Sequence, residues 1–351
     1  MPRLKRYKHH RGVHCGSAAL RNVLHYYTGV QLTEAMCFGL GAGMSFTYVR
    51  QPGSPIHMIT GRGSYIEANF CDALNVQLDV TSTDEADTAW IHLRQCIDDG
   101  SLVMIDTDMF ELPYMVKRLN LAGGLHFGGH KVLVTGYCDE KGVVQLADYA
   151  WQQEQELEFG RLRAARDSRL GSSRPGNACF RFHFPDELPP FEHAICLALH
   201  NMVNQMRHPY LHFNGLPAIQ RFCRQLPNWN KAMRGEDLQR NLSMAAFMLE
   251  KAGTGGGAFR NLYSRFLEEA GQLLDAPQLH RAASIYRDLS GHWREVAALL
   301  DESVDGSPNG IFANGKDVRN LMNDIAENEE LGVEVIATFS KELRTMRETI
   351  C

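Results

Sequence analysis

The stretch GVHCGSAALRNVLHYY, from Gly12 to Tyr27, decides how the N-terminal half of this 351-residue chain is interpreted. Gly16 and Ser17 fall in the first turn of a predicted helix, which places Cys15 at its start. The apolar residues that define this helix recur at intervals of three and four: Ala19, Leu20, Val23, Leu24 and Tyr27. Unpaired N–H groups and the positive dipole end of the first turn stabilise a thiolate. Cys15 is therefore a candidate nucleophile, and the alternative is a small buried residue that packs the helix.

A second segment, GGHKVLVTGYCDEKGVVQLADYA, has the pattern of a β-hairpin. Residues 130–137 are predicted to form a buried strand, residues 139–142 a turn and residues 143–148 a second strand. Antiparallel pairing brings His130, at the start of the first strand, close to Asp148, at the end of the second. A carboxylate there holds the imidazole in one tautomer while the other ring nitrogen faces a nucleophile. We therefore predict that Cys15, His130 and Asp148 form a catalytic set of the papain-like type.

Several stretches of the chain resemble the butirosin biosynthesis protein H family, whose fold is related to papain-like and bacteriocin-processing cysteine peptidases. They are His14 to Ser17 with its helix, FGLGAGMSF at 38–46, Ile59 to Arg62 with Glu67, the hairpin of His130 and Asp148, and GTGGGAFRNLYSRFLEEA at 253–270. The resemblance implies an α+β protein with a papain-like, cysteine-peptidase-type N-terminal domain followed by an all-helical C-terminal domain. It also implies acyl transfer, because the namesake moves an acyl group from a carrier-protein thioester onto an amine.

The chain divides near Pro185 to Pro190. Before this point strand patterns alternate with predicted helices, and after it nearly every segment has helical apolar spacing. The helices predicted in the second half are residues 192–207, 216–225, 236–251, 258–274, 278–300 and 318–347. We expect a papain-like catalytic domain over residues 1–187 and a helical domain over residues 188–351 that covers the cleft. The polar stretch 161–176 is predicted to be a mobile insertion between strands.

These observations predict an acyltransferase that works through an acyl-Cys15 intermediate. Cys15 attacks an acyl thioester, His130 accepts the thiol proton, and Asp148 orients His130. The expected donor is an acyl carrier protein, or alternatively coenzyme A, which presents the acyl group on phosphopantetheine. A small-molecule amine then accepts the acyl group and an amide forms, in the biosynthesis of a natural product such as an antibiotic. The alternative is a cysteine peptidase, amidase or thioesterase that uses water as acceptor. A binding module without catalysis is disfavoured because all three residues are present.

The donor that stabilises the oxyanion departs from the papain pattern. Papain-like enzymes place a glutamine about six residues before the cysteine, and His9 stands in that position here. His9 or the neighbouring His10 could donate a hydrogen bond to the oxyanion, together with the backbone N–H of Cys15. The alternative is that both histidines belong to a solvated basic N-terminus. His14, beside the nucleophile, is interpreted as a residue that shapes the site, because only His130 has the orienting carboxylate.

Further residues are candidates for substrate binding. The glycine-rich stretch before residue 258 precedes a predicted helix, so its N–H groups could receive a phosphate or carboxylate, and an arginine one turn later could bind the same anion. The alternative is an ordinary turn between helices. The candidates, including those given by the resemblance, are His14, Arg62, Glu67, Thr254, Gly255, Gly256 and Arg260.

The composition excludes several other classes of protein. A formal charge of −5 gives no basic surface, so nucleic acid is not an expected partner. No apolar run of membrane-spanning length occurs, and no apolar stretch follows the basic start MPRLKRYKHHR, so we expect a soluble, cytoplasmic protein without a membrane partner. Nine cysteines without CxxC pairs argue against disulfides and structural zinc, and we expect no metal and no bound cofactor. A homodimer is left open, and the predicted core thiols include Cys71, Cys96, Cys196 and Cys223.

Overall fold

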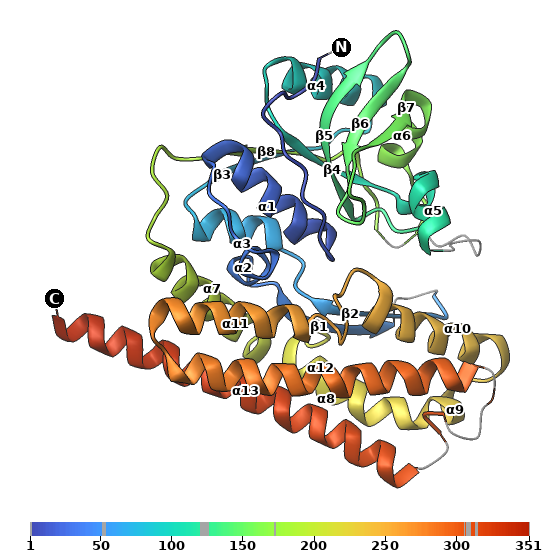
Figure 1. Ribbon diagram of the computed structural model, residues 1–351. Helices are drawn as coiled ribbons and strands as arrows, with labels where there is room; N and C mark the ends of the chain where they lie inside the picture. The colour runs from blue at the N-terminus through green and yellow to red at the C-terminus, as the bar shows by residue number, and fades with distance from the viewer. Residues whose placement is uncertain are drawn as a thin grey trace. The chain divides into compact units, whose positions relative to one another are not determined.

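The computed structural model describes residues 2–50, 54–119, 126–171, 173–304, 306, 310–312 and 315–350, with the backbone alone for 342–350. They form two compact units (Figure 1). Unit 1 comprises Met1–Cys37 and Leu74–Leu188, and unit 2 comprises Phe38–Ala73 and Pro189–Cys351. The division therefore differs from the expected one, because residues 38–73 group with the C-terminal part of the chain. The strands and helix of this segment pack on helices that follow residue 189.

Unit 1 is built on a six-stranded sheet in the order β3-β8-β4-β5-β6-β7, in which every neighbouring pair is antiparallel. The strands are β3 (Gln77–Thr81), β4 (Val103–Thr107), β5 (His130–Cys138), β6 (Val143–Ala147), β7 (Gln155–Glu158) and β8 (Cys179–His183). The predicted hairpin is present as β5 and β6, with Leu133 opposite Ala147. This register places the start of β5 beside the end of β6, where His130 and Asp148 lie.

The helices of unit 1 enclose the sheet. They are α1 (Cys15–Thr28), the first part of α2 (Glu34–Leu40), α4 (Ala86–Asp98), the short η1 (Met109–Glu111), α5 (Pro113–Leu119) and α6 (Phe159–Asp167). Apolar residues of α4 and α6 share one core with the inner strands, for example Leu93, Leu162 and Val132. Helix α6 occupies part of the stretch predicted to be a mobile insertion, because Leu162 and Ala165 are buried in that core.

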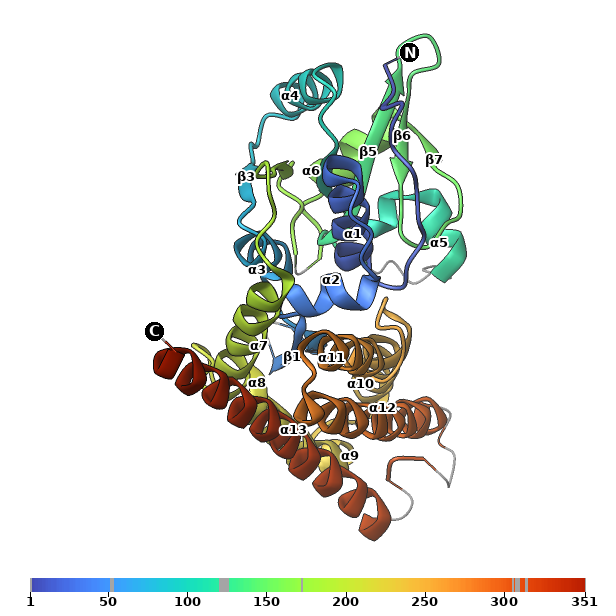
Figure 2. The same ribbon diagram turned by 60° about the vertical axis from the view of Figure 1, so that its left-hand side comes forward.

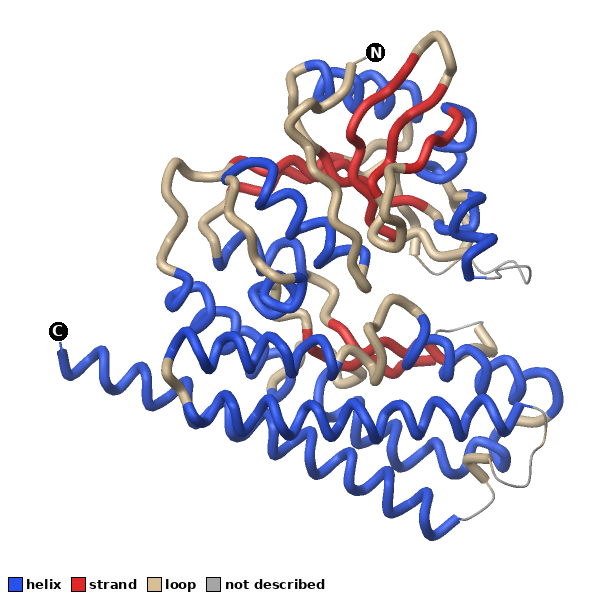
Figure 3. The backbone as a smooth tube through the Cα atoms, viewed as in Figure 1, coloured by secondary structure: helices blue, strands red, loops and turns tan. Residues whose placement is uncertain are grey.

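Unit 2 is helical apart from one two-stranded sheet, β1 (Met44–Arg50) with β2 (His57–Arg62), drawn red in Figure 3. Its helices are α3 (Ile66–Ala73), α7 (Phe191–Arg207), α8 (Gly215–Gln225), η2 (Leu226–Asn228), α9 (Trp229–Ala232), α10 (Gly235–Ala246), the π-helical turn η3 (Phe247–Lys251), α11 (Arg260–Leu274), α12 (Pro277–Val304) and α13 (Gly315–Ile350). Helix α12 packs on α11 and α13, as Figure 2 shows. Mixed α and β structure followed by a helical C-terminal region is as predicted. Within the described residues, no helix is long and apolar enough to cross a bilayer.

Candidate functional site

Helix α1 begins at Cys15, as the sequence predicts, and the residue before it caps the helix. His14 is the N-cap, with extended backbone, and its Nδ1 accepts the N–H of Ser17 at 3.2 Å. The Glu34 carboxylate accepts the N–H groups of Val13 at 2.9 Å and His14 at 2.8 Å, and the hydroxyl of Ser17 at 3.1 Å. The start of α1 is therefore fixed by a histidine and a carboxylate that satisfy its exposed N–H groups.

The hairpin brings a histidine and an aspartate together in the interior of unit 1. Nε2 of His130 lies 2.7 Å from Oδ2 of Asp148, and both side chains are buried. The thiol of Cys15 hydrogen-bonds with the His130 side chain, and because Nε2 is taken by Asp148, Nδ1 is the nitrogen that serves this bond. The ring of Tyr149 packs edge-on against His130 at 5.8 Å between centroids. Thiol, imidazole and carboxylate thus form one continuous chain.

Two backbone and side-chain contacts hold the segment before α1 against the hairpin. The N–H of Gly12 donates to the carbonyl of Tyr149 at 2.7 Å, one residue beyond Asp148. Nε2 of His9 lies 2.8 Å from the carbonyl oxygen of Trp151. These contacts connect the start of α1 with the end of β6, so the same backbone segment positions Cys15 and Asp148.

The charges of the site favour an ion pair between Cys15 and His130. Burial raises the pKa of the Cys15 thiol, but the electrostatic interaction with His14 and the hydrogen bonds of His130 and His14 outweigh it, and the pKa lies well below its usual range. Burial also opposes the charge on His130, yet the Asp148 carboxylate and the Cys15 thiol raise the pKa of His130 to about 10. A thiolate beside an imidazolium is the state in which a cysteine acts as a nucleophile at neutral pH.

Glu34 and Ser17 are site residues that sequence reasoning missed. Glu34 follows α1 and begins α2, and it reaches back to the N-terminal turn of α1. A signal was available in Gly12, because a Cβ at that position would lie 2.4 Å from Oε2 of Glu34. The glycine that opens the GVHCGS stretch is therefore required by the close approach of this carboxylate.

The surroundings of His9 and His10 differ from those expected of an oxyanion donor. Both ring nitrogens of His9 are engaged, Nδ1 with the Tyr7 hydroxyl at 3.0 Å and Nε2 with the Trp151 carbonyl. The side chain of His10 is exposed, and its ring packs near that of His25. Burial and the charge of Arg21 lower the pKa of His10, which disfavours its protonated form. The prediction that His9 or His10 donates to the oxyanion is therefore not supported.

The glycine-rich turn of unit 2 uses its own N–H groups. The Thr254 hydroxyl donates to the carbonyl of Glu250 at 2.9 Å and accepts the N–H of Gly256 at 3.0 Å, while the N–H of Gly257 donates to the Glu250 carboxylate at 2.9 Å. A Cβ at Gly256 would lie 2.2 Å from the Arg294 guanidinium. The prediction that Thr254, Gly255 and Gly256 bind an anion is not supported, because the Thr254 hydroxyl and the N–H groups of Gly256 and Gly257 are bonded within the turn and α11 starts only at Arg260.

Arg260 is a buried structural residue. Its Nε lies 2.6 Å from Oε1 of Glu329, and both side chains are fully buried. Its Nη1 donates to the carbonyls of Ser45, Gly61 and Ala258. These bonds connect β1 and β2 with α11 and α13, so the structure assigns Arg260 to the interior of unit 2 and not to a substrate. Arg62 and Glu67 are half-buried residues of the same unit, and their roles stay predictions.

Comparison with known protein families places both halves of the chain. A model described as butirosin biosynthesis protein H, N-terminal, matches residues 14–149, which include Cys15, His130 and Asp148. The N-terminal part of the chain belongs to the butirosin biosynthesis protein H family. A second model, a domain of unknown function (DUF4872), matches residues 160–343. No curated protein matches the chain. The family inferred from the sequence motifs is therefore confirmed, and the helical half belongs to a domain type without an assigned role.

Proposed function

We propose that this protein is a cysteine-dependent acyltransferase with a papain-like catalytic unit, and that it forms amides in natural-product biosynthesis. The observation that carries the proposal is the buried chain of Cys15, His130 and Asp148 at the start of α1, with a bond of 2.7 Å between the histidine and the aspartate. The family supports it, since its name refers to the biosynthesis of butirosin. The proposed donor is an acyl thioester on phosphopantetheine, carried by an acyl carrier protein or coenzyme A.

In the first half-reaction the Cys15 thiolate attacks the carbonyl carbon of the thioester. The bond between that carbon and the pantetheine sulfur breaks, and the His130 imidazolium gives its proton to the leaving thiolate. In the second half-reaction an amine attacks acyl-Cys15, the carbon–sulfur bond to Cys15 breaks, and His130 takes the proton that the amine loses. The amide leaves, and the thiolate–imidazolium pair is restored. Asp148 keeps its charge throughout and stabilises the imidazolium.

Backbone donors at the start of α1 are suited to the oxyanion. Glu34 accepts the N–H groups of Val13 and His14, and His14 accepts that of Ser17. The N–H groups of Cys15 and Gly16 have no acceptor among the residues that the structure describes. Both lie at the positive end of the helix dipole, next to the atom where negative charge develops.

His14 complements this arrangement as a donor. A neutral imidazole that accepts a hydrogen bond at Nδ1 carries its proton on Nε2. Because Nδ1 of His14 accepts the Ser17 N–H, we assign the interaction of His14 with the Cys15 thiolate to the buried Nε2. We therefore assign the two imidazoles different tasks. His130 moves protons, and His14 donates to the thiolate and takes the part that the sequence analysis gave to His9.

Mass spectrometry of the intact protein tests the function. The protein is incubated with short acyl thioesters of pantetheine, and then with a panel of primary amines. We expect one acyl group per chain, its loss when amine is added, and an equal amount of amide in solution. Cys15→Ala should remain unmodified. The matched control is Cys138→Ser, which changes another buried cysteine of unit 1 and should behave like the wild type.

The outcomes separate the alternatives. An acyl-enzyme that decays at the same rate with and without amines, and yields only free acid, identifies a thioesterase or another hydrolase. An adduct that persists in Cys15→Ala contradicts the assignment of the nucleophile. A failure to form any adduct with thioesters, while peptide or amide bonds are cleaved, identifies a peptidase or amidase.

A further inference from the structure

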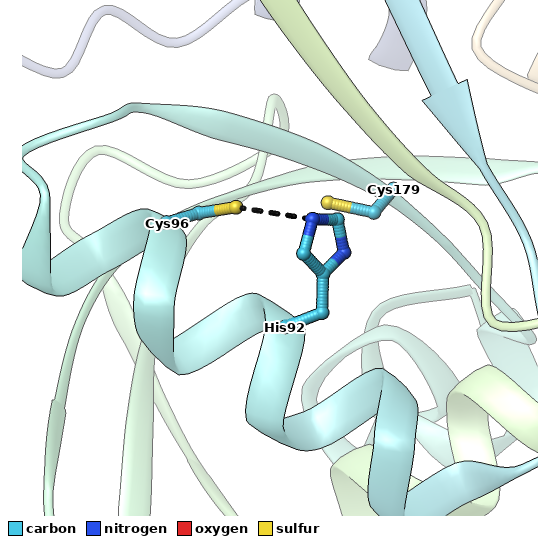
Figure 4. A group of neighbouring side chains, drawn as sticks. All are labelled: His92, Cys96 and Cys179. Carbon is cyan, nitrogen blue, oxygen red and sulfur yellow. Dashed lines mark hydrogen bonds between the residues drawn. The ribbon is translucent and has the colours of Figure 1, made fainter.

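A second group of reactive side chains lies in unit 1, on elements that the proposed mechanism does not use. His92 and Cys96 belong to α4, and Cys179 begins β8. Their Nε2 or Nδ1 and Sγ atoms all lie within 4.8 Å of one another. Figure 4 shows both sulfurs directed to the same side of the imidazole, with Cys96 Sγ 3.8 Å from Nε2 of His92. Both cysteines are buried, whereas His92 is half-buried.

The local geometry of α4 explains how two of these side chains meet. Residues four apart lie on the same face of a helix, so His92 and Cys96 project in the same direction. The third side chain comes from a strand, and Cys179 pairs with Ile105 of β4 in the sheet against which α4 packs. Three donors from two elements thus converge with the backbone as it stands in the structure. Cys96 and Cys179 are 83 positions apart in the sequence.

The contacts of His92 leave its Nε2 directed to the two cysteines, as coordination of a metal through this atom requires. Its Nδ1 lies 3.4 Å from the Thr81 hydroxyl. Such a contact from the ring nitrogen that does not face the cluster is the usual support for a metal-bound histidine, because it fixes the ring orientation and leaves the other nitrogen as the ligand. Thr81 belongs to β3, so the support comes from an element separate from those that supply the three donors.

Two arginine side chains lie near the cluster and partly offset the cost of a buried anionic sulfur. The buried Arg166 guanidinium interacts electrostatically with both cysteines, and Arg181 does so as well. Among the common cations, zinc is the one that prefers a tetrahedral site of thiolate and imidazole ligands. Two thiolates and a divalent cation form a neutral group, which lowers the cost of burial in this core.

We propose that His92, Cys96 and Cys179 bind a zinc ion, with water in the fourth position on the half-exposed side of His92. The ion would connect α4 with β8 and so fix the packing of α4 on the sheet. This differs from the sequence analysis, which took Cys96 as a core thiol and expected no metal. The proposal is independent of acyl transfer, because neither Cys15 nor the hairpin takes part in it.

Metal analysis of the purified full-length protein tests the site. The protein is reconstituted with Zn²⁺ under reducing conditions, passed over a desalting column and measured by elemental mass spectrometry. We expect about one zinc per chain, the stoichiometry of a mononuclear site. Cys96→Ser, Cys179→Ser and His92→Ala should each lose most of it, while Cys138→Ser, another buried cysteine of unit 1, should keep it. Co²⁺ in place of Zn²⁺ should give the sulfur-to-cobalt absorption band of a tetrahedral thiolate site.

Two results of the metal analysis would overturn the proposal. One is wild-type protein that stays free of zinc after reconstitution and gives no thiolate band with Co²⁺. The other is zinc that is retained equally by the Cys96→Ser and Cys179→Ser variants. Because these buried substitutions can affect folding, the half-exposed His92→Ala variant and the spectrum of the Co²⁺-loaded wild type provide readouts that do not depend on them. A disulfide between Cys96 and Cys179 that survives reduction and prevents metal uptake would contradict the proposal as well.

Discussion

The rate at which a small electrophile alkylates Cys15 should be nearly independent of pH between pH 6 and 9. An unperturbed thiol, with a pKa near 8.5, is only about 0.3 % thiolate at pH 6 and gains roughly tenfold in thiolate per pH unit. The pKa of Cys15 lies well below that range because two imidazoles oppose the effect of burial. In His130→Ala one imidazole is lost while the burial remains. The rate should then rise with pH, by up to about tenfold per unit wherever the pH lies below the pKa of the variant's thiol.

The readout is the slope of the pH profile and not the absolute rate. A thiol of low pKa has a larger thiolate fraction, but its thiolate is a weaker nucleophile, so the two effects partly cancel in the absolute rate. Iodoacetamide labelling is followed by peptide mass spectrometry, which separates Cys15 from the other cysteines. The His14→Asn variant keeps a good N-cap but removes the second imidazole, so its profile should lie between the other two. The pKa shifts define the pH range of the ion pair. It is lost below the pKa of Cys15, where the thiolate is protonated, and again above about pH 10, where His130 loses its proton. A wild-type rate that rises tenfold per unit from pH 6 would refute the ion pair.

Two further substitutions test the hydrogen bonds of each unit. Asp148→Asn should slow the acylation of Cys15 by less than His130→Ala does, and should move the alkaline limit of activity below about pH 10, because an amide orients His130 without stabilising its charge; an unchanged alkaline limit would contradict this role. Arg260→Ala should lower the unfolding free energy of unit 2 by about 3–5 kcal/mol, since Glu329 would be left buried and unpaired. At roughly 2–4 °C per kcal/mol the melting temperature should fall by about 6–20 °C. Calorimetry measures this, and the double variant Arg260→Met with Glu329→Leu, which removes both charges, should lose less.

Local patterns in the sequence were sufficient to predict that Cys15 begins a helix and that His130 lies beside Asp148. The start of α1 follows from helical spacing around Cys15, and the closeness of His130 and Asp148 follows from a hairpin with a short turn. The start of α1 depends on contacts between neighbouring residues, and the closeness of His130 to Asp148 depends on the register of a single pair of strands. The position of Cys15 against that hairpin depends on a contact between distant segments, and it was predicted from the order of cysteine, histidine and aspartate along the chain.

Contacts between distant segments account for what the sequence did not reveal. Arg260 looks like an exposed anchor beside a glycine turn, but its partner Glu329 is 69 positions away and both are buried. Residues 38–73 have strand and helix signals of their own, yet the unit that they join is decided by the helices that pack on them. The cluster of Cys96 and Cys179 was hidden for the same reason, because spacing alone cannot show which thiols meet.

The position of Glu34 explains how a carboxylate can lie near a cysteine that must become anionic. A free carboxylate close to Cys15 would raise the thiol pKa by repulsion. Here its oxygens accept two backbone N–H groups and the Ser17 hydroxyl, so its charge is largely spread over local donors. The carboxylate also accepts the N–H groups of Val13 and His14, which precede Cys15. In the proposed mechanism the two acidic groups therefore act differently: Asp148 maintains the charge of His130, and Glu34 occupies neighbouring donors so that the N–H groups of Cys15 and Gly16 are the ones that face a substrate oxygen.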